Sequence, residues 1–108
     1  MGYSLGELEQ LILLALLRLG DDGFGVRVQR EIEERGGRQV SLGAVYTALI
    51  RLEAKGYVVG REGAPTAQRG GRRKKLYRVQ PLGQRALASA LSAVREMSRG
   101  LAPRLEVR

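Results

Sequence analysis

The sequence predicts a mainly α-helical chain with one small β-hairpin, arranged as a winged helix-turn-helix followed by a C-terminal helix. Three observations predict this fold: apolar residues recur at helical spacing, a glycine-rich stretch separates two short β-rich runs, and basic residues gather around that stretch. At 108 residues, with 44% apolar and 28% charged residues, the composition is that of one globular domain. We expect residues 1–80 to form the winged unit, residues 81–102 a C-terminal dimerisation helix and residues 103–108 a frayed tail.

The first predicted helix begins after Ser4, which with Glu7 makes the Ser-x-x-Glu pattern of a capping box. Apolar residues then recur at helical spacing and define one stripe. Leu13, Leu14 and Leu17 fall on the opposite side of the same helix. A helix that is apolar on two sides needs two partners, and the second is either another subunit or the rest of its own domain.

Two shorter helices follow and are joined by a tight turn. We predict them at Gly25–Arg35 and Leu42–Lys55, with Gly36-Gly37 ending the first and Ser41 capping the second. Two such helices make a helix-turn-helix candidate, a common pattern that is weak evidence by itself. The inward positions are Val28, Ile32, Val45, Leu49 and Leu52.

A change of period marks two short strands, predicted at Tyr57–Val59 and Leu76–Val79. Glycine and proline cluster between them, at Gly60, Gly63 and Pro65, and this favours a hairpin loop. Two helices followed by a hairpin are the sequence plan of a winged helix.

The positive charge is concentrated in the second half of the chain. The net charge is +8, and six Lys or Arg lie within residues 69–78. No acid lies between residues 63 and 95. Such a field favours a polyanion, either nucleic acid or an anionic membrane face, and the alternative is a basic loop that only keeps the protein soluble. Because the cluster falls on the hairpin, beside the third helix, we favour nucleic acid.

Composition also excludes several kinds of site. Cysteine and histidine are absent, which excludes disulfides, thiol and imidazole catalysis, and metal sites built on these residues. No phosphate-binding glycine loop of the P-loop type occurs, so we expect no enzyme, no cofactor and no metal. The longest apolar run, Leu11–Leu17, is far shorter than the about 18 residues of a membrane span, and the N-terminus lacks the features of a secretory signal. We therefore expect a cytoplasmic protein without membrane contact.

Pro81 is predicted to begin the last helix, because its fixed φ suits the first helical position. Apolar side chains then repeat every seven residues with others between them, which is typical of a short coiled-coil-like seam and indicates a partner helix. The seam residues are Leu87, Ala90, Leu91, Val94, Met97 and Leu101.

Two motifs in order resemble the PadR-type winged-helix transcriptional regulators. Ser41-x-Gly43-x-x-Tyr46-x-x-Leu49-x-x-Leu52-Glu53-x-x-Gly56 is similar to the third helix of that family. Gly70-Gly71-Arg72-x-Lys74-Lys75-x-Tyr77-Arg78, followed by Pro81-x-Gly83, is similar to its wing and to the entry of its last helix. The resemblance covers residues 5–100, and the short chain resembles the compact branch with a single C-terminal helix.

The resemblance implies a sequence-specific transcriptional regulator, with repression as the common expectation, that binds a pseudo-palindromic operator in double-stranded DNA. The third helix would enter the major groove, and the wing would supply affinity through phosphate contacts. For Tyr46 the alternative is a core position beneath the hairpin. The expected DNA contacts are Arg38, Gln39, Ser41, Gly43, Ala44, Tyr46, Thr47 and Arg51 from the turn and helix, and Arg72, Arg73, Lys74 and Lys75 from the wing.

The resemblance also implies a homodimer in which the first and last helices exchange contacts, with an apolar cavity between the subunits that binds a small aromatic effector in some members. A closed interface without a ligand is the alternative for that cavity. The alternative functions are a non-specific architectural DNA-binding protein and a winged-helix protein–protein adaptor. The residues expected at the interface or cavity are Leu13, Leu17, Leu87, Ala90, Leu91, Val94, Met97 and Leu101.

Overall fold

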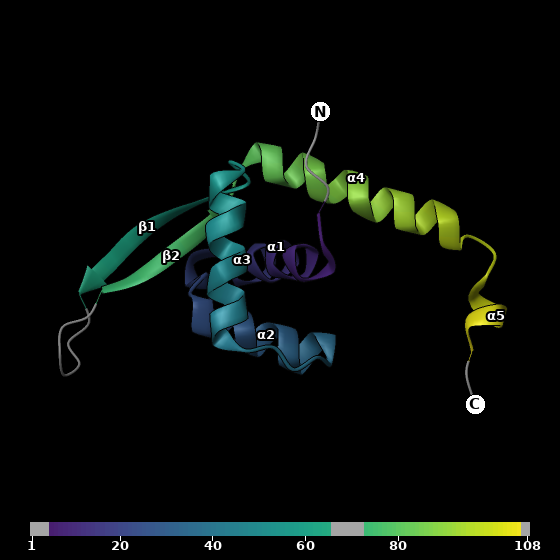
Figure 1. Cartoon of the computed structure of the whole chain (residues 1–108), viewed down its shortest axis with the longest axis horizontal. Coiled ribbons are helices and arrows are strands. Elements are labelled where there is room, and N and C mark those ends of the chain that lie inside the picture. The colour runs from purple at the N-terminus through teal and green to yellow at the C-terminus, as the bar shows by residue number, and fades with distance from the viewer. Residues whose placement is uncertain (1–4, 66–72, 107–108) are drawn as a thin grey trace.

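The computed structural model describes residues 5–65 and 73–106 of the chain. Within those ranges the chain is mostly helical and carries one antiparallel hairpin, which confirms the predicted fold class. Figure 1 shows α1, α2 and α3 grouped together, with the hairpin leaving this group on one side and α4 on the other. The elements are α1 (Glu7–Leu19), the 3-10 turn η1 (Gly20–Asp22), α2 (Gly25–Gly36), α3 (Leu42–Ala54), β1 (Val58–Pro65), β2 (Arg73–Val79), α4 (Pro81–Ser98) and α5 (Ala102–Leu105).

The core lies between α1, α2 and α3 and extends to the base of the hairpin. Helical spacing explains it, because side chains three and four residues apart share one face of a helix. The predicted inward positions of α2 and α3 are confirmed as buried. Completely buried side chains are Ile12, Leu13, Val28, Val45, Leu49 and Leu52.

The predicted starts of α2 and α3 are confirmed, and their observed last residues, Gly36 and Ala54, each differ from the prediction by one residue. Gly37 follows α2 with a φ of +67°, a left-handed conformation that glycine adopts without strain. Ser41 caps α3, where its Oγ accepts a hydrogen bond from the amide of Ala44 at 3.1 Å. These two caps fix the turn that connects the helices.

The start of α1 differs from the prediction. The helix begins at Glu7 with Gly6 at the N-cap, and Glu9 Oε1 accepts a hydrogen bond from the Gly6 amide at 3.0 Å. The predicted cap, Ser4, lies outside the described residues. Glu7, its predicted partner in the capping box, forms an ion pair with Arg38.

The hairpin is longer than predicted, with β1 running to Pro65 and β2 starting at Arg73. Gly60, Gly63 and Pro65, which we placed in the loop, belong to β1 instead. A Cβ atom on Gly60 would lie 2.9 Å from the ring of Tyr77, its partner on β2. Glycine is therefore favoured here because the two strands are crowded at this position. A sequence pattern does not distinguish such a glycine from a glycine in a turn.

A short contact fastens the hairpin to the turn before α2. Phe24 forms an isolated antiparallel bridge with Leu76, and the amide of Tyr77 donates to the carbonyl of Gly23 at 3.0 Å. A Cβ atom on Gly23 would lie 2.5 Å from the carbonyl oxygen of Tyr77, so this close approach requires glycine. No local sequence pattern indicates this contact.

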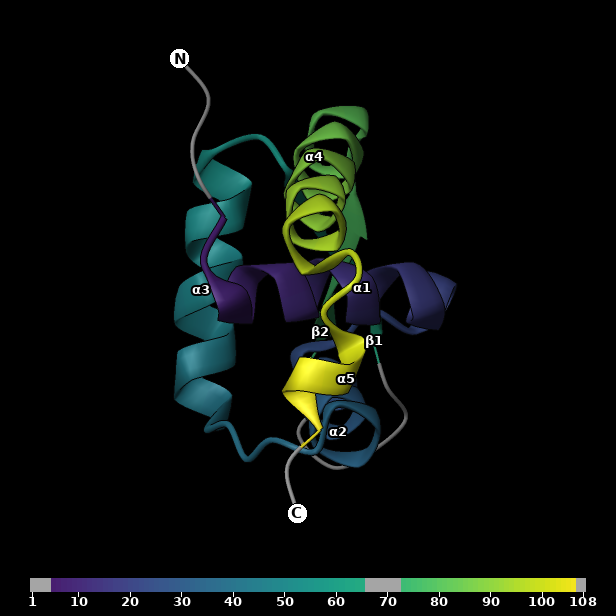
Figure 2. The same cartoon turned by 90° about the vertical axis from the view of Figure 1, so that its right-hand side faces the viewer.

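The last helix begins at Pro81, as predicted, but ends at Ser98 and not at residue 102. Gly100 reverses the chain with a φ of +79°, so Leu101 leaves the helical seam. The segment predicted as a frayed tail contains α5 instead. Figure 1 shows α4 extending away from the three-helix group, with α5 beyond its far end, and Figure 2 shows the molecule from that end. Among the described residues, no helix has the length and apolar character that a membrane span needs.

Candidate nucleic-acid interface

The outer face of α3 is the first component of the candidate interface. Val45, Leu49 and Leu52 point into the core, so the opposite side of the helix faces away from it. Figure 1 places α3 in front of α1, next to the base of the hairpin. The outward positions, all exposed, are Gly43, Thr47, Ile50, Arg51 and Ala54.

The turn before α3 holds two of the predicted contact residues. Arg38 and Gln39 are both exposed. The guanidinium of Arg38 donates to both carboxylate oxygens of Glu7, with 2.9 Å between Nη2 and Oε2. Arg38 is therefore held beside the start of α1, and it would have to leave Glu7 to contact a base. Ser41 is exposed but uses its hydroxyl as the cap, and Ala44 is half-buried.

Tyr46 occupies a position between the two alternatives that the sequence left open. Its ring packs against Gly25 at the start of α2, where a Cβ atom would lie 2.5 Å from the ring. The side chain still has 38% of its surface exposed. One side of the ring is therefore fixed by α2, while the rest faces solvent beside the outer face of α3.

Two lysines in the described part of the wing, Lys74 and Lys75, lie on opposite faces of β2. Nζ of Lys74 lies 4.9 Å from the ring centroid of Phe24. Nζ of Lys75 lies 5.3 Å from the ring centroid of Tyr77. The backbone of Arg73 begins β2, while Arg72 lies outside the described residues.

Glu53 links the wing to α3. One carboxylate oxygen accepts from the Gly60 amide at 3.0 Å, and the other lies 3.3 Å from Nζ of Lys75. The charge of the Tyr77 oxygen, and then the hydrogen bond and charge of Glu53, raise the pKa of Lys75. Burial, more than any other cause, raises the pKa of Tyr77. Lys75 is therefore positively charged at neutral pH and is paired with Glu53.

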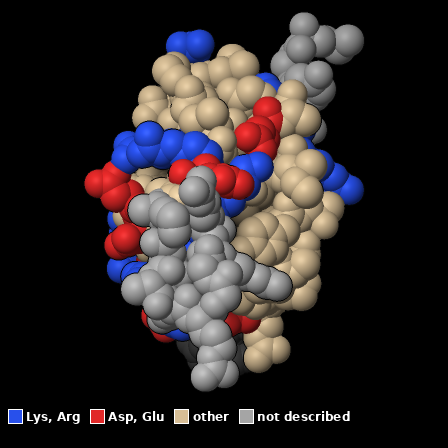
Figure 3. Space-filling model, turned by 90° about the vertical axis from the view of Figure 1, so that its left-hand side faces the viewer, with Lys and Arg blue, Asp and Glu red and all other residues tan. Residues whose placement is uncertain are grey.

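Basic and acidic side chains alternate around the described part of the hairpin (Figure 3). Arg78, for example, is paired with Asp21 of η1. Two bases of the predicted cluster, Arg69 and Arg72, lie outside the described residues. The described residues alone therefore present both signs of charge, and their acids hold several of the bases in place.

The predicted interface residues on α1 and α4 separate into two groups. Leu13 is completely buried and Leu87 is 3% exposed, so both belong to the core of the subunit itself. The prediction placed these two residues at a subunit interface or effector cavity, whereas in the single subunit neither has exposed surface. Ala90 and Leu91 are half-buried. The side chains with exposed surface are Leu17, Val94, Met97 and Leu101.

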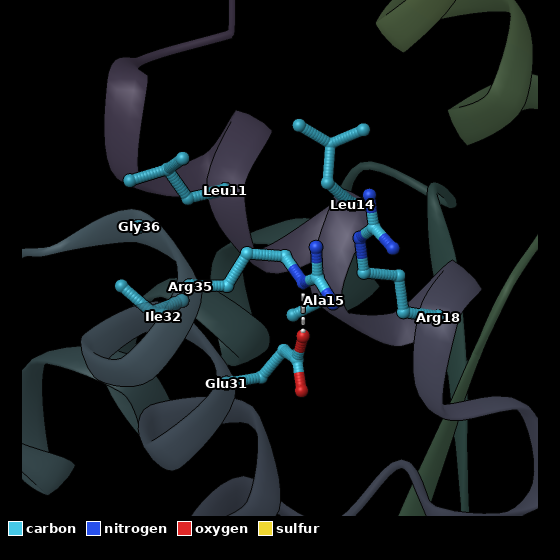
Figure 4. Close-up of a pocket in the computed structure, with 8 residues that line it drawn as sticks. All are labelled: Leu11, Leu14, Ala15, Arg18, Glu31, Ile32, Arg35 and Gly36. Carbon is cyan, nitrogen blue, oxygen red and sulfur yellow. Dashed lines mark hydrogen bonds and ion pairs between the residues drawn. The ribbon is translucent and has the colours of Figure 1, made fainter.

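A groove of about 170 Å³ lies between α1 and α2 (Figure 4). Its apolar floor carries charged groups at the edge, where Nε of Arg35 lies 3.0 Å from Oε2 of Glu31. None of the residues predicted to form an effector cavity lines it. The lining residues are Leu11, Leu14, Ala15, Arg18, Glu31, Ile32, Arg35 and Gly36.

Comparison with known proteins gives a family and several similar folds. The sequence model of the Transcriptional regulator PadR-like family matches residues 13–89. A PadR family transcription regulator from Clostridium difficile matches with a TM-score of 0.75 and 25% identity, over 94% of this chain and 100% of that chain. A PadR-like transcriptional regulator from Bacillus cereus matches with a TM-score of 0.73 and 21% identity, over 94% of this chain and 93% of that one. Bacillus subtilis PadR in complex with operator DNA matches with a TM-score of 0.66 and 25% identity, over 79% of this chain and 46% of that chain. No curated protein matches the chain.

Proposed function

Because the chain belongs to the PadR-like family of transcriptional regulators, we propose that it binds double-stranded DNA sequence-specifically and represses transcription as a homodimer. The observation that carries this proposal is the exposed outer face of α3, with the wing tied beside it through Glu53. The similar Bacillus subtilis PadR was solved with operator DNA, which supports a nucleic acid as the partner. In such recognition, contacts to the base edges would determine which DNA sequence is bound, whereas contacts to phosphates would position the protein on the duplex.

In this proposal the outer face of α3 enters the major groove and the wing follows the adjacent backbone. Two of the predicted DNA contacts, Arg38 and Lys75, are ion-paired with carboxylates in the free chain. Phosphates would compete with Glu7 and Glu53 for these bases. The acids therefore act as internal competitors that keep the wing and the turn ordered before DNA arrives.

The dimer proposal depends on the exposed apolar side chains of α1 and α4. Leu17, Val94 and Met97 expose 47%, 59% and 79% of their surfaces. Burying such groups against a second copy would gain free energy in proportion to the apolar area removed from water. Release of DNA by a small apolar effector stays a prediction. In that prediction, Val94 and Met97 are among the side chains that would contact the effector.

Selection of bound fragments from a random DNA pool, followed by direct binding measurements, tests the function. The selected duplex and a shuffled duplex of the same composition are compared at about 50 mM and about 200 mM salt. A sequence-specific regulator keeps its preference for the selected duplex as salt rises, although both affinities fall. If both duplexes bind equally at both salts, the protein is architectural. If neither binds, the adaptor alternative is favoured.

A further inference from the structure

The outermost ridge of α3 carries no charged side chain. At 100° per residue, Gly43, Thr47, Ile50 and Ala54 fall on one line along the helix, opposite the buried face. Ile50 is 64% exposed, compared with 46% for Val26 and for Val59. This isoleucine stands at the centre of the surface that we propose to enter the major groove.

The polar side chains that flank this ridge make other contacts or are poorly placed to contact a base. On one side, Glu53 is bound to the hairpin and Tyr46 packs on Gly25. On the other side, Arg51 lies at the flank of the ridge, where it suits a phosphate better than a base edge. The side chains that read guanine and adenine by paired hydrogen bonds, Arg, Lys, Asn and Gln, are absent from the ridge itself.

We propose that the ridge reads thymine, with Ile50 and the methyl group of Thr47 packing against thymine 5-methyl groups in the major groove. Thymine is the only base that presents a methyl group there, so an aliphatic side chain distinguishes it from cytosine and from purines. Gly43 and Ala54, being small, let the helix approach closely enough for this contact. The inference rests on the proposed DNA-binding function and adds the kind of base that α3 reads.

The size of the effect follows from the apolar area of one methyl group. Burying a group of that size is worth about a fourfold change in a binding constant. Replacing a contacted thymine by uracil removes the methyl group and leaves the hydrogen-bonding edge unchanged. Because a dimer repeats each contact in both half-sites, a symmetrical replacement weakens binding by about the square of that factor.

The test is a uracil-interference experiment on the duplex selected by the wild-type protein. Uracil replaces thymine at random positions, bound and free DNA are separated, and each position is scored for loss of binding. The experiment uses the wild type, Ile50→Ala, and Thr47→Ser, which keeps the hydroxyl and removes the methyl group. Leu82→Ala is the matched control, because Leu82 is an aliphatic residue of α4 with 47% exposure, outside α3.

The expected result is that the wild type and Leu82→Ala lose about fourfold in binding at particular thymines, whereas Ile50→Ala loses less than twofold at the same positions. If the wild type prefers its selected duplex but no thymine is sensitive to uracil, the thymine proposal fails and the DNA-binding function stands. The same conclusion holds if the sensitive positions are unchanged in both α3 variants. If the wild type has no sequence preference, both proposals fail. Circular dichroism checks that each variant remains folded.

Discussion

Glu9 connects the start of α1 to the end of α3. Its two carboxylate oxygens accept from the Gly6 amide at 3.0 Å and from Nζ of Lys55 at 2.8 Å. Both charged side chains are largely removed from solvent, with 13% of Glu9 and 18% of Lys55 exposed. Burial of the carboxyl acts to raise its pKa, but the hydrogen bonds from Lys55 and Gly6, with the charges of Lys55 and Arg51, outweigh burial and leave the pKa lowered.

A lowered pKa of Glu9 predicts a specific dependence of stability on pH. The folded chain holds the carboxylate more strongly charged than the unfolded chain does, so the contribution is full above the unfolded pKa of about 4.3 and is lost as pH falls through the folded pKa. Glu9→Gln should lower the free energy of unfolding by about 1 kcal/mol at pH 7. Urea unfolding should show that this difference shrinks as the pH falls below the unfolded pKa and through the folded one.

The matched control for Glu9→Gln is Glu34→Gln. Glu34 is an exposed residue of α2, and the structure describes no ion pair for it. Its replacement should change stability by less than about 0.5 kcal/mol at either pH. An equal effect of the two substitutions at pH 7, or a difference that persists at low pH, would contradict the role of the Glu9–Lys55 pair.

Replacing glycine by alanine should change the stability in opposite directions at two positions. At Gly83 a Cβ atom would lie 2.3 Å from the carbonyl oxygen of Tyr57, so the start of α4 would have to move. At Gly43, in the first turn of α3, nothing lies within 4 Å of the added atom. Gly83→Ala should therefore cost about 2 kcal/mol of stability, whereas Gly43→Ala should gain about 0.5 kcal/mol. Urea unfolding of both variants measures this contrast, and similar effects at the two sites would refute it.

At the scale of elements, we expect the angle between the wing and α3 to depend on Glu53. Its carboxylate is the described link between the last turn of α3 and both strands. Glu53→Ala removes the acceptor of the Gly60 amide, and a hydrogen bond to a charged group contributes about 1.5–3 kcal/mol. The Gly60 amide should exchange with solvent at least about tenfold faster in this variant, as measured by hydrogen exchange.

The control for the wing experiment is an amide held only by backbone. The Tyr77 amide donates to the carbonyl of Gly23, so its exchange should change much less than that of Gly60. Equal acceleration at both amides would mean that Glu53→Ala loosens the whole hairpin. No acceleration at Gly60 would show that the strands position the wing without Glu53.

The helices were predictable because their signals are local. Ser41 and Gly37 act through neighbouring backbone atoms, and the buried faces repeat within each helix, so a single sequence contains the necessary information. The wing was predicted only in outline. Gly60 is crowded by the ring of Tyr77 on the other strand, and the Phe24–Leu76 bridge joins residues far apart in the chain. Such contacts have no signal in the local pattern.

The exposed positions of the candidate site were predictable from the sequence, but the ion pairs within it were not. The exposed positions of α3 follow from helical spacing, and the structure places Gly43 and Thr47 there. Spacing does not show that Arg38 is paired with Glu7. Helical spacing also led us to place Leu13 at a subunit interface or cavity. Spacing alone does not show how many elements of the same chain surround a helix. In the structure α1 is central and is covered on more than one side.

The whole molecule is more extended than a single compact domain of its length. Its radius of gyration is 15.7 Å, against about 13 Å expected for a compact chain of this size. The hairpin projects from the three-helix group on one side, and the second half of α4 with the following α5 projects on the other (Figure 1). Among the described residues of that projection, Val94 and Met97 are exposed apolar side chains on one side of the helix. A short helix without a packing partner is marginal in water, so this shape favours a second copy as its support.

Replacing Val94 and Met97 together by Glu should therefore convert a dimer into a monomer, because two charges would be buried at the seam. Without a partner the second half of α4 should also lose helicity. Light scattering measures the mass, and circular dichroism measures the helix content. Ser89→Glu with Ser92→Glu is the matched control, since both serines are exposed on the other side of α4, and this variant should stay dimeric. A wild type that is monomeric would refute the homodimer, whereas a dimeric Val94–Met97 variant would place the interface away from α4. Leu13 is unsuitable for this test because charge at a completely buried position would unfold the subunit itself.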